Sequence, residues 1–367
     1  MSARHDSHVI ILLLFPGLAE DVAAPITGTA KRGRMQVWNA WSGLGRSAFI
    51  ADGGPRDRDP KRILVTLVLG LGIACVAAMA GWVLIMAPEA ILTGHGAEGI
   101  KGLGAAAVPL ADFRVGGLEV TVVRLLVATG SDSLFLLAFV AVAAAVAGHD
   151  LKRYWTAAPR IRWRLIAGGL VLAMVVLAPA VAAERLLYSG ADPLPVESIS
   201  HHILGRLAYA ASALLLIPAA AAEELFFRGW LLRQIATLSR RPAVMIGVTA
   251  FIFSALHLDF TADGFFTRAL MGAGLCYMTL RLGGIEFAAG VHAANNILIV
   301  LFLQPLVLAP TAAQGGLTFG SLFEDFVLIA GYVVITEAVA RVPALRRWLG
   351  VQAGEISADA ALPAALG

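Results

Sequence analysis

The sequence predicts an all-α polytopic membrane protein, a bundle of about eight transmembrane helices with a polar cavity inside the membrane. Of its 367 residues, 59% are hydrophobic and only 14% are charged, whereas soluble domains contain about 45–50% apolar residues. Apolar runs of the length needed to cross a bilayer, about 20 residues, recur along the chain. Lys and Arg gather in the short connections between these runs, which is typical of membrane topology.

The chain divides into a helical bundle at residues 61–343 and two shorter ends. Residues 1–60 are mixed and mostly polar, and residues 52–60 have the Asp, Gly and Pro content of a solvated linker. We therefore expect a flexible amino-terminal tail before the first span. Residues 344–367 become polar and Ala-rich and are expected to form a carboxy-terminal tail.

Four apolar runs are assigned as the first four spans. The first follows two basic residues and ends before Pro88, and the third follows the basic connection 149–164. The purely apolar part of the second is too short to cross alone, so this span is extended backwards. The fourth carries charges near its centre. The expected ranges are Ile63–Met86, Leu125–Ala147, Leu165–Ala183 and Leu207 to beyond Trp230.

Four further runs complete the predicted bundle. The fifth is short and is followed by a polar turn at residues 259–264, and the sixth ends at the Gly283-Gly284 turn. The seventh is stopped by Pro305, because proline cannot continue a helix. The expected ranges are Ala243–His257, Phe265–Leu282, Ile285–Leu303 and Leu322–Ala340.

The loop charges predict the orientation of the bundle. With the amino terminus inside, the internal loops hold five, three and one Lys or Arg, and the external loops hold two, two, one and none. Because positive residues are retained on the cytoplasmic side, both termini are expected to face the cytoplasm, in a bacterial cytoplasmic membrane. The net charge of +3 is modest and spread over the loops, which argues against nucleic acid as a partner.

The fourth span contains an unusual group of charges. Glu223, Glu224 and Arg228 lie in a run that is otherwise apolar. Ionised groups at membrane depth cost at least ~2.5 kcal/mol each, so such residues indicate a functional site. Glu224 and Arg228 are four residues apart on a helix and can form an ion pair. Glu223 is rotated about 100° away, which leaves this carboxylate free for chemistry.

Polar residues also interrupt the fifth and seventh spans. His257 closes the fifth span, and His292 and Asn296 lie in the seventh. His292 and Asn296 share a helix face, so both can direct hydrogen-bond donors to one place. The small residues around them, among them Gly290, would let a neighbouring helix approach closely. We expect all these polar side chains to share one cavity.

Such a cavity supports hydrolysis of a peptide-like bond. Glu223 can act as the base that deprotonates water, and a nearby imidazole can orient that water. His292 and Asn296 can donate hydrogen bonds to the oxyanion of a tetrahedral intermediate. The sequence has no Gly-x-Ser-x-Gly motif, and neither Cys75 nor Cys276 is expected near the cluster, so a covalent route is not indicated.

These residues carry a resemblance to a known family. Three motifs, in the same order on three apolar spans, resemble those of the CPBP family of intramembrane proteases, also called CAAX prenyl protease 2 or Abi. This family is similar to the eukaryotic enzyme that removes the last three residues of prenylated CAAX proteins. The resemblance covers about residues 207–303. The motifs are Glu223-Glu224-x-x-x-Arg228, Phe253-x-x-x-His257 and His292-x-x-x-Asn296.

The resemblance implies an intramembrane glutamic endopeptidase. It assigns Glu223 and His257 to water activation, and Glu224 with Arg228 to a supporting role. It assigns His292 and Asn296 to the oxyanion site. It also implies a substrate associated with the membrane, either a peptide or a lipidated protein of the prenylated CAAX type, and no cofactor.

Two alternatives stay open at this point. Glu223, His257 and His292 could form a zinc site of two histidines and one carboxylate, which would make the protein a zinc-dependent version of the same protease. The absence of a His-Glu-x-x-His motif favours the metal-free route. The same buried charges could instead belong to a protein that is not a protease, either a transporter or a scaffold of the immunity type.

Overall fold

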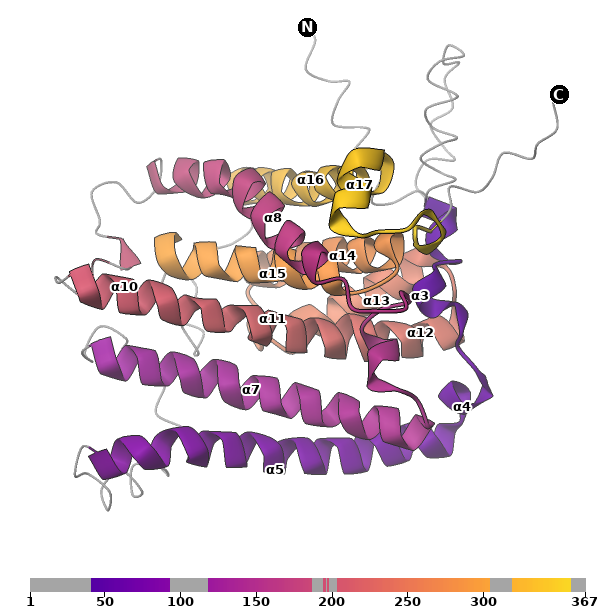
Figure 1. The fold of residues 1–367 in the computed structure, drawn as a ribbon, viewed down its shortest axis with the longest axis horizontal. Helices are drawn as coiled ribbons and strands as arrows, with labels where there is room; N and C mark the ends of the chain where they lie inside the picture. Colours follow the sequence, from indigo (N-terminus) through magenta and orange to yellow (C-terminus); the bar gives the residue numbers. More distant parts are fainter. Residues whose placement is uncertain are drawn as a thin grey trace, which may run out of the picture.

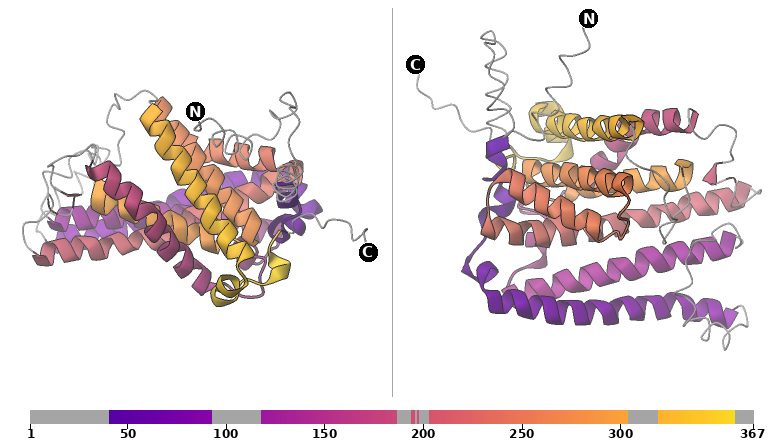
Figure 2. Two further views of the ribbon diagram at one scale, coloured as in Figure 1. Left: turned by 90° about the horizontal axis from the view of Figure 1, so that it is seen from above. Right: turned by 180° about the vertical axis from the view of Figure 1, so that it is seen from behind.

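The computed structural model describes residues 41–92, 118–186, 194, 195, 197, 203–303 and 319–357. The outermost parts of both predicted tails, residues 1–40 and 358–367, lie outside these described residues. All regular elements of the described residues are helices. The predicted all-α polytopic membrane fold is confirmed. The helices lie in layers, with α5 and α7 on one side and α8 and α16 on the other (Figures 1 and 2).

The first layer is an antiparallel pair of long helices, α5 (Pro60–Leu92) and α7 (Leu118–Ala147). Both are apolar around their whole circumference, as expected for helices in contact with lipid. The ring of Phe139 lies only 2.9 Å from where a Cβ would stand at Gly70, so the small residue sets how closely the two helices pack. The other side of α7 contacts α11.

The central span is long and composite. It consists of α10 (Ile203–Ser212), η4 (Ala213–Leu215), α11 (Leu216–Glu224), η5 (Leu225–Leu231) and α12 (Leu232–Leu238). Together these pieces form one helix of 36 residues, Ile203–Leu238. η5 is a π-helical segment and begins directly after Glu224. Wider helical turns of this kind occur frequently at functional sites.

The next three helices fold against the central span. α13 (Pro242–Ala255) follows α12 closely, since only the three residues 239–241 separate the two helices. α14 (Ala262–Leu282) ends at Gly283, which has φ of 71°. This left-handed conformation favours glycine and reverses the chain within a few residues. α15 (Glu286–Leu298) follows and continues into the π-helical η6 (Ile299–Leu303).

α8 (Trp163–Glu184) packs closely against α15. A Cβ at Gly290 would collide with the carbonyl oxygen of Ile166 and would lie 2.7 Å from the backbone nitrogen of Leu170. The backbones of the two helices are therefore in direct contact. The expected close approach at the small residues of the seventh span is confirmed.

The carboxy-terminal part covers α14 from the other side. α16 (Phe319–Arg341) packs against α14. The next helix, α17 (Pro343–Leu349), is bent by 90° relative to α16. The short η7 (Ala353–Glu355) then lies near the start of α15. Arg162 joins these parts, because it donates to Glu286 at 2.6 Å and to Glu355 at 3.0 Å.

The predicted number of spans is not confirmed. Each of the eight predicted segments is helical, but the described residues contain five helices that are long and apolar enough to cross a membrane, or six if α16 and α17 form one bent span. α13 has only 14 residues, about 21 Å of helix against a hydrocarbon core of ~30 Å. α14 has 21 residues, which is long enough, but it is not apolar enough to be counted as a membrane-spanning helix. It carries Asp263, Arg268 and Arg281.

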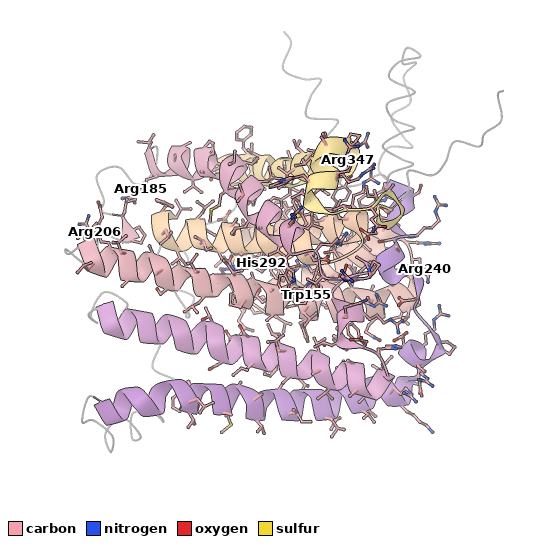
Figure 3. All side chains as sticks on the ribbon, in the orientation of Figure 1. Trp155, Arg185, Arg206, Arg240, His292 and Arg347 are labelled. Atoms are coloured by element: carbon pink, nitrogen blue, oxygen red, sulfur yellow. The ribbon has the colours of Figure 1, made fainter. Side chains whose placement is uncertain are left out.

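One end of the bundle is basic and holds the amino-terminal segment. α3 (Ala48–Ala51) and α4 (Pro55–Arg58) lie in the region that the sequence assigns to the tail, and Phe49 is fully buried there. Arg233 of α12 donates to the Phe49 carbonyl and pairs with Asp52. Figure 3 shows Arg240 and Arg347 at this end, which we call the basic end, and Arg206 at the opposite end.

Asp57 anchors the same segment to η2 (Leu151–Tyr154) and to its flanking residues. It pairs with His149 at 2.8 Å and with Arg153 at 3.2 Å. Burial alone would raise the pKa of the Asp57 carboxyl. Hydrogen bonds from the Gly54 backbone and from His149, together with the charge of Arg153, outweigh burial and lower this pKa below its usual range.

Candidate active site

The site is built around a buried carboxylate, Glu224, at the carboxyl end of α11. Its Oε1 atom accepts hydrogen bonds from Arg228 Nη1 and from His292 Nδ1, both at 2.8 Å. The side chains of Glu224 and Arg228 have no exposed surface, and His292 is nearly as buried. The predicted ion pair between positions four apart on the helix is confirmed. Figure 3 shows His292 near the middle of the bundle.

The guanidinium of Arg228 is fixed on several sides. Nη2 donates to the carbonyl of Gly272 on α14 at 3.1 Å. The guanidinium carbon lies 4.4 Å from the centre of the Phe253 ring, a cation–π distance. The thiol of Cys276 also lies beside Arg228. The expectation that no cysteine lies near the cluster is wrong, because α14 packs directly against the central span.

Glu223 occupies a different environment from Glu224. Its side chain is 27% exposed, whereas that of Glu224 is completely buried. Oε2 of Glu223 lies 3.8 Å from Nε2 of His292. The imidazole therefore stands between the two carboxylates, with one nitrogen toward each. The two glutamates therefore differ as the sequence predicts. Arg228 pairs with Glu224, whereas the carboxylate of Glu223 stays partly exposed.

His257 follows the last turn of α13. Its Nδ1 donates to the Phe253 carbonyl at 2.7 Å, which leaves Nε2 of a neutral imidazole as a hydrogen-bond acceptor. The ring centre of Phe253 lies 4.7 Å from that of His257 and 6.0 Å from that of His292. His257 is exposed and lies within electrostatic range of Glu223. Phe253 thus packs near both imidazoles.

The helix lengths explain how His257 reaches the level of Glu223. Glu223 lies 15 residues before the end of α12 (238 − 223), and His257 lies 15 residues after the start of α13 (257 − 242). The two helices are joined by a short connection, so both counts begin at almost the same level. At ~1.5 Å per residue, both side chains lie about 22 Å from the basic end. α13 is about 21 Å long, shorter than the ~30 Å hydrocarbon core of a bilayer.

Asn296 lies one helical turn beyond His292 on α15 and is half-buried. Its Oδ1 accepts a hydrogen bond from Asn295 Nδ2 at 3.4 Å, and the same nitrogen lies 3.7 Å from the sulfur of Met271. Asn295 therefore turns the amide of Asn296 so that its nitrogen is the end available to an oxyanion. Through Met271, Asn295 also contacts the neighbouring helix α14.

Sequence reasoning gave no role to Asp132, a further acidic residue. Asp132 lies on α7, is exposed to the surroundings of the chain, and interacts electrostatically with Glu223. It lies 15 residues before the end of α7 (147 − 132), the same count as for Glu223. Because a carboxylate is costly in an apolar span, the sequence alone could have marked Asp132 as a candidate site residue.

The alternative zinc site would require side chains of Glu223, His257 and His292 to meet at one point. Among the described residues, no three His, Cys, Asp or Glu side chains are arranged so that they could hold a metal ion. His292 Nδ1 is engaged by Glu224, and His257 Nδ1 is engaged by a backbone carbonyl. Only the Nε2 atoms of these two histidines remain available as ligands.

Comparison with known proteins agrees with the position of the site. Residues 205–298 match the family described as Type II CAAX prenyl endopeptidase Rce1-like, and this segment contains all seven motif residues. The chain is also similar to an uncharacterized protein, YyaK, of Bacillus subtilis strain 168, with 27% identity over 154 residues, or 39% of this chain. The matched region covers 49% of YyaK, so the chain spans about half the length of this curated relative. No solved structure gives a significant match.

Residues 205–298 thus match the Rce1-like family, which is a family of membrane proteases. The described helices, five of which are long and apolar enough to cross a membrane, agree with an integral membrane protein. The resemblance that the sequence analysis placed at about residues 207–303 is confirmed, with bounds that differ by only a few residues.

Proposed function

We propose that the protein is a metal-free intramembrane endopeptidase that hydrolyses a peptide bond of a membrane-associated substrate. One observation carries this proposal. A fully buried Glu224 holds His292 by Nδ1, so that Nε2 points toward the partly exposed Glu223. This arrangement places a general base and a hydrogen-bond donor on either side of a position that a substrate carbonyl can reach.

His292 is suited to stabilise an oxyanion. Oε1 of Glu224 accepts hydrogen bonds from both Arg228 and His292, so Nδ1 of His292 carries the proton that it donates. When Nε2 is also protonated, the imidazolium has a negative partner on its buried side and presents N–H on its open side. The buried carboxylate stabilises the imidazolium in the same way as the Asp of a catalytic triad. Asn296 supplies the second donor.

Glu223 and His257 are suited to activate water. Glu223 accepts the proton of a water molecule that attacks the carbonyl carbon, and later returns it to the leaving amine. Nε2 of His257 accepts the other hydrogen of that water and so fixes its orientation. Both residues lie on the open side of the site, where water and substrate arrive.

We further propose that the substrate is a membrane-associated peptide or a lipidated protein, with a prenylated CAAX protein as the first candidate. The family description names a CAAX prenyl endopeptidase, and this name supports the candidate. The excess of Lys and Arg at the basic end supports an orientation with both termini in the cytoplasm of a bacterium. The partners are then the lipid bilayer and this substrate.

The test is cleavage of a lipidated peptide library by the purified full-length protein, with products identified by mass spectrometry. Glu223→Gln is expected to lower kcat at least ~10²-fold, because general base catalysis contributes typically 10²–10⁴-fold. Glu324→Gln is the matched control, since Glu324 is an exposed carboxylate on α16 outside the site. Normal cleavage by Glu223→Gln would show that another group is the base.

The same assay tests the metal-free mechanism. A strong chelator is expected to leave the rate unchanged, because the proposed steps use only side chains and water. Loss of activity with chelator, restored by zinc, would favour the alternative site at Glu223, His257 and His292. Flux of ions across reconstituted vesicles without any cleaved peptide would favour a transporter instead.

A further inference from the structure

A fully buried tyrosine outside the matched segment lies next to the site. Tyr332 belongs to α16, and its side chain is 0% exposed. α16 begins beyond residue 298, where the Rce1-like match ends. The hydroxyl of Tyr332 has no hydrogen-bond partner among the described residues. A buried polar group without a partner requires an explanation, because it has lost water without replacement.

A glycine lets Tyr332 reach the centre of the bundle. A Cβ at Gly274 on α14 would lie 2.7 Å from the Tyr332 ring, so any larger residue there would push the ring away. The ring belongs to the apolar cluster that includes Leu275 of α14 and Val291 of α15. Its hydroxyl lies within electrostatic range of both Glu224 and Arg228. Tyr332 therefore extends toward the buried ion pair from α16, which packs against α14.

Two atoms of the buried Glu224–Arg228 ion pair also have no hydrogen-bond partner among the described residues. These are Oε2 of Glu224 and Nε of Arg228. The Tyr332 hydroxyl can donate and accept, Glu224 Oε2 can accept, and Arg228 Nε can donate. One water molecule with two to four polar neighbours satisfies groups of this kind in protein interiors.

We propose that Tyr332 is a positioning residue of the site, and that one buried water joins its hydroxyl to Oε2 of Glu224. Oε1 of Glu224 already accepts from Arg228 and His292, so this water fixes the remaining oxygen and prevents the carboxylate from rotating. A fixed Glu224 keeps Nε2 of His292 directed at the open side. The effect on catalysis rests on the proposed function, whereas the link between Tyr332 and Glu224 does not.

The first measurement is steady-state cleavage by Tyr332→Phe in the full-length protein. The phenyl ring keeps the packing against Gly274, and only the hydroxyl is lost. kcat is expected to fall about fivefold to tenfold, the equivalent of roughly one hydrogen bond, with KM unchanged because Tyr332 does not touch the substrate. Tyr154→Phe is the matched control, since Tyr154 is also buried with an unpartnered hydroxyl but lies at the basic end.

The second measurement does not depend on activity. Thermal unfolding midpoints are compared for the parent protein, Tyr332→Phe, Glu224→Gln and the double variant, and the cycle is repeated with Tyr154→Phe in place of Tyr332→Phe. If one water joins Tyr332 and Glu224, the double variant loses less than the sum of the two single losses. The cycle with Tyr154→Phe is expected to be additive.

The outcomes separate the two proposals. Additive losses in the Tyr332 cycle, or an unchanged kcat for Tyr332→Phe in an active enzyme, overturn the role of Tyr332. A parent protein that cleaves no peptide overturns the proposed function, and the unfolding cycle still decides whether Tyr332 is coupled to Glu224. A fall in kcat together with a non-additive cycle supports both.

Discussion

Two neighbouring glutamates have opposite environments in this protein. Glu224 is buried and shares one of its oxygens between Arg228 and His292, whereas Glu223 is partly open and lies 3.8 Å from His292. The difference arises because consecutive residues on a helix point about 100° apart. One residue step along the chain thus separates a structural carboxylate from a chemically available one.

Replacing Arg228 should destabilise the protein, because the buried carboxylate of Glu224 then loses its positive partner. Arg228→Met leaves Glu224 with only His292 as a partner in a site without solvent, and breaking a buried pair on one side costs typically 3–5 kcal/mol. We expect a clear fall in the thermal unfolding midpoint and loss of cleavage.

The double variant Glu224→Met with Arg228→Met provides the control for this prediction. Two apolar side chains of similar volume remove both charges together, so much of the stability should return. Activity should stay lost, because His292 no longer has its buried partner. Equal stability of Arg228→Met and the parent protein would contradict a tightly desolvated pair.

The motif residues of the site could be predicted from the sequence because charges are costly in apolar helices. Glu223, Glu224 and Arg228 stand out on this ground alone, and helical spacing predicted which glutamate pairs with the arginine. Asp132 is also a charged residue in an apolar helix, and the same argument applies to it. Tyr332 gives no such signal, because a tyrosine is ordinary in an apolar span and its neighbours come from other helices.

At the scale of helices, close packing of α8 and α15 positions His292. Gly290 lies two residues before His292, and its lack of a side chain lets the backbone of α8 touch α15. The spacing of small residues made this contact predictable. The sequence also predicted that the fifth span is short, and α13 has only 14 residues.

Substitution of Gly290 should therefore separate two helices and disturb the site. In Gly290→Val, the new side chain meets backbone atoms of Ile166 and Leu170 that cannot rotate away. We expect a loss of at least ~2 kcal/mol in unfolding free energy, within the range of overpacking effects, and reduced cleavage. Thermal unfolding and the peptide assay measure these effects.

Gly72→Val on α5 is the matched control, since nothing lies within 4 Å of a Cβ built there. This variant should unfold at about the same temperature as the parent protein and should keep its activity. A similar loss of stability in both variants would mean that the effect comes from helix propensity rather than from the contact between α8 and α15.

At the scale of the whole molecule, the amino-terminal segment is attached to the basic end by charged groups. Asp52 and Asp57 connect this segment to Arg153 and Arg233, which belong to η2 and α12. The connection joins parts of the chain that are about 100 to 180 residues apart. The composition of residues 52–60 gave no sign of it, because the same polar residues suit a linker.

This attachment should weaken in acid. The folded pKa of Asp57 is lowered, so its contribution to stability is complete above the unfolded value of about 3.9 and is lost as the pH falls through the lower folded value. We expect protease cleavage near residues 52–59 to become faster below about pH 4, before the membrane helices unfold. Limited proteolysis with an acid-active protease would measure this.

Asp57→Asn is the control for the acid experiment. The amide cannot ionise, so this variant should be cleaved faster already at neutral pH and should show a smaller change on acidification. A pH dependence identical to that of the parent protein would show that another group controls the attachment.

The early end of α13 also bears on how a hydrolase inside a membrane obtains water. Its 14 residues span about 21 Å, roughly 10 Å less than a hydrocarbon core of ~30 Å. The turn after His257 contains the ion pair of Asp259 with Arg268 and the cap at Thr261. Polar backbone and charge within a bilayer persist only beside water or protein. A helix this short would leave that polar turn within the thickness of the bilayer, which would give water a route to the proposed base Glu223 from the side of the turn.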